Sequence, residues 1–578
     1  MTDAVQNVSA GDPVDETSPT KVSKVEVIKR EGHQLRGQIA AELASDATRF
    51  TEDSVQLLKF HGMYQQDDRD ERAARRQEGL DRAYSMMIRA RIPGGILSAD
   101  QYLAFDRLAD EYGNGTMRIT TRQTFQLHGI LKGDIKQTLR SLNDALVTTL
   151  GGCGDQVRNI LMCPAPRADG LHDQLRPYLL ALVDALSAKT RAYHEIWLDG
   201  ERVESPPPGQ EEPFYGATYL PRKFKLALAI EGDNCVDVYA NDLGIVAHHD
   251  NGKLTGFTLL VGGGMGRTAG KEDTYPRLAT PIARIEPAEL VEVAIAVVGI
   301  QRDFGNRSER RYSRFKYLLD ERGVDWFCEE LHRRLGRVLA PAGNLAWGET
   351  SDHLGWHSSG GGQYYFGIHV QNGRLQDTPG KRLKSVLREL VATWHPTVRM
   401  TCEQNILLTD LSEPAYDHIS RALAQSGVKR VEEISATVRH AMACVALPTC
   451  GLALAESERA LPAVLAEVEQ IVDQLGLSQE VFSIRMTGCA NGCARPYIGD
   501  VGFVGRSPGL YDIFLGGDFT GSRLNARYQE LVPIAELATR IHGLLLVFKR
   551  ERVQGERFGD FCQRVGFEYL RGTTGVPV

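Results

Sequence analysis

The chain has 578 residues, 42% hydrophobic and 24% charged, which is the composition of a folded globular protein with room for roughly four domains. Its net charge of -7 argues against a nucleic-acid-binding protein, and ten cysteines are too few for a disulfide scaffold. No apolar run is long enough to span a membrane, and the N-terminus lacks a signal-peptide pattern. We therefore expect a cytoplasmic, multidomain, catalytic protein with reduced thiols and neither a nucleic-acid nor a membrane partner.

The first 54 residues form a separate segment. Residues 1–20 contain four acids, no Lys or Arg and no aromatic residue, so they predict a flexible tail. The mixed basic stretch that follows favours a solvated arm, with a docking element for a partner as the alternative. We expect packed structure to begin near residues 50–60.

Farther along, several segments have the periodicity of regular elements. Residues 224–230 and 256–264 resemble buried strands ended by glycine. The Pro-rich segment 206–213 predicts a loop. Residues 461–475 and 534–548 carry apolar side chains at helical spacing, so both predict amphipathic helices packed on a core.

An internal repeat is the strongest organisational signal. Residues 115–130 resemble 396–411, and 257–263 resemble 511–517, in the same order. The matched pairs include Arg118 with Arg399, Thr120 with Thr401, and Gln123 with Gln404. The copies differ chemically, because Arg122 corresponds to Glu403 and the clustered cysteines belong to the second copy. A duplicated protein with one working site between its halves is indicated.

Four of the ten cysteines form two pairs. Cys444 and Cys450 lie in ACVALPTC, and Cys489 and Cys493 lie in GCANGC. Thiolates in turn-rich loops suit an iron–sulfur cluster or zinc, and the five-residue first gap fits a zinc knuckle poorly. A 4Fe-4S cluster is favoured over zinc, and zinc over ordinary core thiols. The remaining cysteines are scattered and are interpreted as small core residues: Cys153, Cys163, Cys235, Cys328, Cys402 and Cys562.

A second group of residues is cationic. It comprises Arg89, Arg91, Arg118, Arg122, Arg158, Arg222, Lys223 and Lys225. Lys223 and Lys225 are two apart at the start of an apparently buried strand, so they share a face and call for an anion. The pattern at 264–269 resembles a dinucleotide motif, but the prolines and glycine after it exclude the required helix. With no nucleotide or flavin domain visible, electrons for any redox reaction must come from a partner.

These motifs together resemble the sirohaem-containing sulfite and nitrite reductase family, from about residue 55 onward. The resemblance rests on LLKFHGMYQQDDRDER, RARIPGG, TRQTFQLHGI, YLPRKFK, LLVGGG, QRDFGNR, ACVALPTCGLALAESER, TGCANGC and FGDF. LKFHGMYQQDDRD and LPRKFK favour the sulfite reductase branch. At the position of Lys225, nitrite-reducing relatives tend to carry asparagine.

The resemblance implies an α+β fold with internal duplication and pseudo-two-fold symmetry. Two ferredoxin-like half-modules and two larger cofactor-binding modules would follow one another along the chain. The expected divisions are a flexible arm at 1–54, half-modules at 55–150 and 346–430, a sirohaem and substrate module at 151–345, and a 4Fe-4S and sirohaem module at 431–578.

The resemblance also implies the roles of the site residues. Cys444, Cys450, Cys489 and Cys493 would hold the 4Fe-4S cluster, with Cys493 also ligating the sirohaem iron. The substrate anion would be bound by Arg91, Arg158, Lys223 and Lys225. The sirohaem carboxylates would be met by Arg118, Arg122 and Arg222, with Gln126 and His128 lining the same region.

The implied reaction is the six-electron reduction of sulfite to sulfide, in the haemoprotein (beta) component of an assimilatory sulfite reductase that serves cysteine biosynthesis. Electrons would come from a flavoprotein (alpha) subunit that oxidises NADPH, with ferredoxin as the alternative donor. A sirohaem nitrite reductase is the alternative activity. A zinc-stabilised binding protein that grips an anionic partner is the alternative of another class.

Overall fold

The computed structural model describes residues 22–189, 196–198, 201–204, 212–348 and 350–575. The predicted tail at 1–20 and most of the predicted loop at 206–213 therefore lie outside the described residues. None of the described helices is long and apolar enough to cross a membrane.

The segment between residues 22 and 54 is folded, which corrects the expectation of a solvated arm. It forms α1 (Lys24–Glu31) and α2 (Ile39–Leu43), and α3 (Glu52–Leu58) follows. Lys29 of α1 is 1% exposed and donates to the carbonyl oxygen of Leu220 at 2.8 Å. Its ammonium also lies 3.8 Å from Asp155. Packed structure therefore begins well before the expected start near residue 50.

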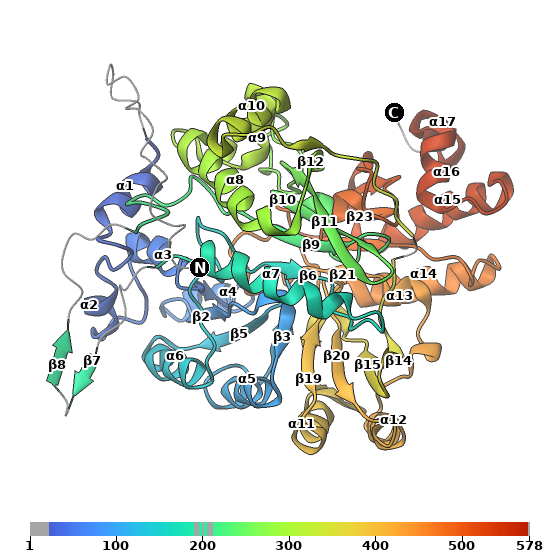
Figure 1. Ribbon diagram of the computed structural model, residues 1–578. Coiled ribbons are helices and arrows are strands. Elements are labelled where there is room, and N and C mark those ends of the chain that lie inside the picture. Colours follow the sequence, from blue (N-terminus) through green and yellow to red (C-terminus); the bar gives the residue numbers. More distant parts are fainter. Residues whose placement is uncertain (1–21, 190–195, 199–200, 205–211, 349, 576–578) are drawn as a thin grey trace.

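Two five-stranded antiparallel sheets form the two smaller modules, shown at the bottom of Figure 1. The first has the order β1-β2-β5-β4-β16, with β1 (Met63–Asp67), β2 (Tyr84–Arg89), β4 (Met117–Ile119), β5 (Phe125–Ile130) and β16 (Arg374–Leu375). The second has the order β14-β15-β20-β19-β3, with β3 (Ile96–Leu97), β14 (Gly355–Gly360), β15 (Gln363–Ile368), β19 (Thr397–Met400) and β20 (Ile406–Leu411). Each sheet thus takes its last strand from the other half of the chain.

The larger modules contain two mixed sheets of matching topology. The first has the order β13-β12-β11-β10-β9-β6, with β6 (Leu161–Met162), β9 (Leu226–Ile230), β10 (Leu243–Asp250), β11 (Lys253–Val261), β12 (Thr280–Ile285) and β13 (Ala340–Pro341). The second has the order β21-β22-β23-β24-β25, with β21 (Met442–Ala443), β22 (Ile484–Thr487), β23 (Val501–Ser507), β24 (Leu510–Leu515) and β25 (Ala526–Pro533). In each sheet three neighbouring strands run parallel and the rest antiparallel.

The predicted repeat is confirmed at the level of single hydrogen bonds. The first matched pair of segments forms the hairpins β4–β5 and β19–β20, and the second pair falls on β11 and β24. Gln123 donates to the carbonyl oxygen of Met400 at 3.0 Å, and Gln404 donates to that of Ile119 at 3.3 Å. Equivalent glutamines therefore reach across the pseudo-two-fold axis in both directions.

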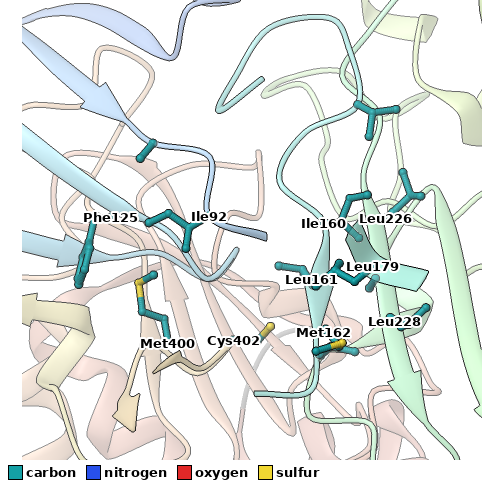
Figure 2. Close-up of a cluster of buried hydrophobic side chains, with 14 of the residues drawn as sticks. Ile92, Phe125, Ile160, Leu161, Met162, Leu179, Leu226, Leu228, Met400 and Cys402 are labelled. Atoms are coloured by element: carbon teal, nitrogen blue, oxygen red, sulfur yellow. The ribbon is translucent and has the colours of Figure 1, made fainter. Parts of the chain in front are cut away.

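Helices cover the sheets as the apolar periodicity predicts. The two predicted amphipathic helices appear as α14 (Leu461–Gln474) and α15 (Leu537–Glu551), which pack on one another. In the first larger module, α7 (Leu171–Ala185) contacts α8 (Leu290–Phe304) and β11. Figure 2 shows the core where the halves meet, with Met400 and Cys402 from the second copy near Met162 and Phe125 from the first. This shared core fixes the position of one half relative to the other.

Candidate active site

The four predicted cluster cysteines lie in two loops that leave neighbouring parallel strands. Cys444 follows β21, whereas Cys489 and Cys493 follow β22. Because the carboxyl ends of parallel strands meet at one edge of a sheet, the loops come together there. The backbone N–H of Gly488 lies 3.3 Å from the Cys444 sulfur, and a Cβ at this glycine would lie 2.5 Å from the carbonyl oxygen of Ala455. Only glycine allows the two loops to approach this closely.

The pKa values of three of these thiols are raised, so their thiolate forms need the positive charge of bound iron. Burial raises the pKa of Cys444 to about 12, and the charge of Cys493 adds to the effect. Burial and Cys493 likewise raise the pKa values of Cys450 and Cys489 to about 11. Bound iron reverses this balance, because a metal ion stabilises the thiolate that burial disfavours. Four thiols whose charges act on one another, in turn-rich loops, have the donor chemistry of a 4Fe-4S cluster.

Residues of the first copy hold the loop that carries Cys493. The Thr121 hydroxyl donates to the carbonyl oxygen of Cys493 at 2.9 Å, and Arg495 donates to the carbonyl oxygen of Thr121 at 3.0 Å. The backbone N–H of Arg267 donates to the carbonyl oxygen of Ala490 at 2.9 Å. The glycine-rich turn that resembled a dinucleotide motif therefore supports the second cysteine loop.

Three of the four predicted anion-binding residues, Arg158, Lys223 and Lys225, lie close together, and the charge of Cys493 acts on Lys225. The backbone N–H of Arg158 donates to the carbonyl oxygen of Phe224 at 3.0 Å, between Lys223 and Lys225. Burial holds the pKa of Lys223 well below its usual range, and Arg158 lowers it further. The pKa of Lys225 is also held well below its usual range, by burial and then by Arg122, while the charge of Cys493 acts in the opposite direction. Both lysines lie where a bound anion would restore their charge.

The fourth predicted anion-binding residue, Arg91, points elsewhere. Its Nη1 donates to the Ser187 hydroxyl at 2.6 Å, and its backbone N–H donates to the carbonyl oxygen of Thr148 at 2.8 Å. The Nε and Nη2 atoms of Arg91 are buried and have no hydrogen-bond partner among the described residues. The structure thus leaves donors of Arg91 available for an anion without joining them to Lys223 or Lys225.

The predicted sirohaem contacts differ in how far they are already engaged. Arg118 is paired with Glu458 at 2.8 Å, and Arg374 lies 2.6 Å from the same carboxylate. Arg222 lies 3.6 Å from Asp155, whose pKa is held low, against the effect of burial, chiefly by Arg310 and Lys29. These arginines already have anionic partners.

Other predicted sirohaem contacts have unmet hydrogen-bonding capacity. Both ring nitrogens of His128 are buried without a partner among the described residues, as is the Oε1 atom of Gln126. Arg122 donates to Asn241 at 3.0 Å, and its Nε is also buried without a described partner. Burial and the charges of Arg374 and Arg118 hold the pKa of His128 well below its usual range. Unpaired buried polar atoms are costly, so these residues fit a polycarboxylate group that would supply the missing partners.

The structure adds residues and contacts that the sequence did not indicate. Arg89 donates to the Cys153 sulfur at 3.0 Å, and Tyr64 lies close to both Cys153 and Arg158. Arg495 and Arg485 share the buried carboxylate of Asp237, with 2.8 Å from Arg485 to Asp237. The motif RARIPGG contained Arg89, but no spacing in the sequence linked it to Cys153, 64 positions away.

These features together define a class of protein: an internally duplicated iron–sulfur redox protein with a cationic site for an anion. Residues 181–339 and 435–577 match the family described as "Nitrite and sulphite reductase 4Fe-4S domain". Residues 80–145 and 357–426 match the "Nitrite/Sulfite reductase ferredoxin-like half domain". The chain belongs to the nitrite and sulphite reductase family, which carries a 4Fe-4S cluster and a sirohaem.

Individual relatives cover almost the whole chain. A protein of Staphylococcus saprophyticus named sulfite reductase [NADPH] hemoprotein beta-component is 44% identical over 94% of this chain and 96% of its own length. A protein of Synechococcus elongatus named sulfite reductase [ferredoxin] is 42% identical over 96% of this chain and 91% of its own length. The solved structure of the NirA protein of Mycobacterium tuberculosis has a TM-score of 0.77 and 24% identity, covering 95% of this chain and 98% of that one. The last comparison confirms the fold.

Proposed function

We propose that this protein is the haemoprotein component of a sulfite reductase and reduces sulfite to sulfide with six electrons. The observation that carries the proposal is the grouping of Lys223, Lys225 and Arg158, in which the charge of Cys493 acts on Lys225. A cationic pocket binds the sulfite dianion and stabilises the charge that accumulates as electrons arrive. The names of the curated relatives support sulfite as the substrate.

Each group of residues has a separate task in this proposal. Cys444, Cys450, Cys489 and Cys493 would hold the cluster, and Cys493, the one exposed member, would also ligate the sirohaem iron. When bound, the two cofactors would pass electrons from the donor to the substrate. The sirohaem carboxylates would be met by the predicted contacts: Arg118, Arg122, Gln126, His128 and Arg222.

The cations around the substrate have complementary chemistry. The guanidinium groups of Arg158 and Arg91 can orient an oxyanion with fixed pairs of donors. Lys223 and Lys225 can pass protons to the departing oxygens, because their buried positions weaken their hold on a proton. Reduction of sulfite consumes about as many protons as electrons, so a site for this reaction needs proton donors as well as charge.

We propose a flavoprotein subunit that oxidises NADPH as the electron donor, in the cytoplasm. Relatives named for NADPH support this donor, whereas the relative named for ferredoxin supports the alternative. Thiolate ligands of an iron–sulfur cluster are suited to a reducing compartment.

The donor can be tested with the purified holoprotein. Its absorption spectrum should show a haem Soret band and a longer-wavelength sirohaem band, and sulfide should form with an artificial reductant. Sulfide formation driven by NADPH only when the flavoprotein is added would support this donor. Turnover with reduced ferredoxin but not with NADPH and flavoprotein would exclude it. A colourless, iron-free protein from cells that make sirohaem would exclude the function itself.

A further inference from the structure

A second group of metal-binding side chains lies in the first copy. Its members are Cys163, Asp233, Cys235 and His353. Their ligand atoms all lie within 4.8 Å of one another. Cys163 and Cys235 are buried in the core, as predicted, but they are not scattered, because the fold brings them into one group. The four side chains come from three separate parts of the chain: the end of β6, the loop after β9 and the segment between the two halves.

The distances among Cys163, Asp233 and His353 are close to those around a single tetrahedral ion, and Cys235 lies within 4.8 Å of all three. The Cys163 sulfur lies 3.6 Å from Asp233 Oδ2 and 4.0 Å from His353 Nε2, and the same Nε2 lies 3.6 Å from Asp233 Oδ2. Zinc ligand bonds of about 2.0–2.3 Å place tetrahedral ligands about 3.3–3.8 Å apart. Only a small contraction is needed around one ion, whereas a 4Fe-4S cluster is too large for ligands this close together.

The group is largely buried. Cys163 is 1% exposed, Cys235 8% and His353 6%, and the Asp233 side chain is 18% exposed. Concentrated ligand groups in such a setting are stabilised when a cation replaces their protons.

The position of the group is the pseudo-symmetric counterpart of the cluster site. Met162 pairs with Leu228 between β6 and β9 as Ala443 pairs with Met486 between β21 and β22. The backbone N–H of Cys163 donates to the carbonyl oxygen of Leu228 at 3.3 Å.

In the second copy, the backbone N–H of Cys444 likewise donates to the carbonyl oxygen of Met486 at 3.2 Å. Cys235 lies seven positions after Leu228, and Cys493 lies seven positions after Met486. Cys163 and Cys235 therefore stand where Cys444 and Cys493 stand in the second copy.

The remaining two ligands make the first-copy site different. Asp233 belongs to the loop after β9, and its Oδ1 accepts from the backbone N–H of Cys235 at 3.0 Å. His353 comes from the segment that joins the halves, which is already bound to this loop because Gly348 donates to the carbonyl oxygen of Gly232 at 2.9 Å. Two sulfurs, one imidazole and one carboxylate match zinc rather than iron–sulfur chemistry.

We propose that Cys163, Asp233, Cys235 and His353 bind one structural zinc ion at the pseudo-symmetric counterpart of the cluster site. The ion would tie the segment between the halves to the first larger sheet. All four ligand positions are taken by protein, as in structural zinc sites. The proposal does not depend on which substrate the enzyme reduces.

The test is the metal content of the holoprotein, purified without metal-affinity chromatography from cells grown without added zinc. We expect about one zinc per chain in addition to the cofactor iron. X-ray absorption at the zinc edge, to which iron does not contribute, should show sulfur at about 2.3 Å and nitrogen or oxygen at about 2.0–2.2 Å. Zinc near zero with or without zinc in the medium, or a Cys163–Cys235 disulfide in peptide maps, would overturn the proposal.

Variants separate this site from the cluster cysteines. Cys163→Ser should remove the zinc and keep the iron, whereas Cys489→Ser should lower the iron and keep the zinc. Cys328→Ser, at a half-buried cysteine outside both groups, should change neither metal. If Cys163→Ser does not fold, Asp233→Asn, at the most exposed ligand, should give up zinc to a chelator faster than the unmodified protein. Zinc that disappears with Cys489→Ser or survives Cys163→Ser would show that it binds elsewhere.

Discussion

The Asp237 carboxylate joins the two copies through two buried arginines, so replacing it with asparagine should destabilise the protein strongly. Asp237 lies in the first copy, and its side chain, 7% exposed, pairs with Arg485 at 2.8 Å and with Arg495. Its φ of 49° is left-handed, a conformation that asparagine tolerates, so the substitution removes the charge and keeps the backbone.

Two buried guanidinium groups would lose their counter-charge in this variant. Removing one partner of a buried ion pair costs about 3–5 kcal/mol. Because the amide oxygen of asparagine can still accept hydrogen bonds from the arginines, we expect a loss at the lower end, about 3 kcal/mol. This corresponds to about two powers of ten in the ratio of folded to unfolded protein. For a unit of roughly 150 residues, we expect the melting temperature to fall by roughly 6–12 °C.

The assay is thermal unfolding of the holoprotein, with iron retention measured in parallel. Asp320→Asn is the matched control, because Asp320 pairs with Arg277 at 2.8 Å but is 34% exposed. A surface pair contributes at most about 1 kcal/mol, so the control should change little. Equal melting temperatures for the two variants would refute the reasoning, since burial would then not matter.

The pH dependence of this stability difference follows from the ion pairs of Asp237 with Arg485 and Arg495. Burial raises the pKa of Asp237, but Arg485 and Arg495 outweigh burial and hold it below its usual value. A lowered pKa in the folded state stabilises the protein above the unfolded-state pKa of about 3.9, and this contribution is lost as the pH falls through the folded-state pKa. The difference between wild type and Asp237→Asn should be constant from about pH 6 to 8 and shrink below about pH 4.

Three further substitutions test the site itself. Lys225→Asn should lower kcat/KM for sulfite by about tenfold or more, because a charge-assisted hydrogen bond contributes about 1.5–3 kcal/mol. It should also shift the preference toward nitrite. An unchanged ratio of kcat/KM for sulfite to that for nitrite would contradict this role. Cys493→Ser should abolish the sirohaem absorption and the activity while the far-ultraviolet circular dichroism stays nearly native, and a variant that keeps both would refute its assignment. His128→Phe should lower sirohaem occupancy. It should not lower the melting temperature of the cofactor-free protein, because it removes two nitrogens that are buried without a partner among the described residues. Unchanged occupancy would mean that the imidazole does not contact the cofactor.

Much of the fold could be predicted because the duplication left matching local patterns. The hairpin sequence around Gln123 recurs around Gln404, and the structure gives both glutamines the same role across the axis. Amphipathic periodicity identified α14 and α15, since one face of each must be apolar to pack on the core. The reciprocal exchange of β3 and β16 was not predictable, because strands of two residues carry no periodic signal.

Sequence patterns predict candidate site residues that are close in the chain and miss those that only the fold brings together. The spacing of Cys489 and Cys493 and the pair Lys223 and Lys225 were visible directly. The second ligand group was not, because Cys163 and His353 are separated by 190 positions and meet only in the fold. The N-terminal segment was misjudged because its basic composition is typical of a solvated arm. The ammonium group of Lys29 is instead buried by partners from distant parts of the chain, which composition does not reveal.

The most direct test of the central claim, that the cations and the cysteine loops form one sulfite-reducing centre, is the yield of sulfide per electron. The holoprotein is given limiting reduced dye and excess sulfite, and sulfide and oxidised dye are measured together. The account predicts one sulfide for every six electrons, with the yield lost in Cys493→Ser. Oxidation of the dye without sulfide, or the same sulfide yield from Cys493→Ser, would contradict it.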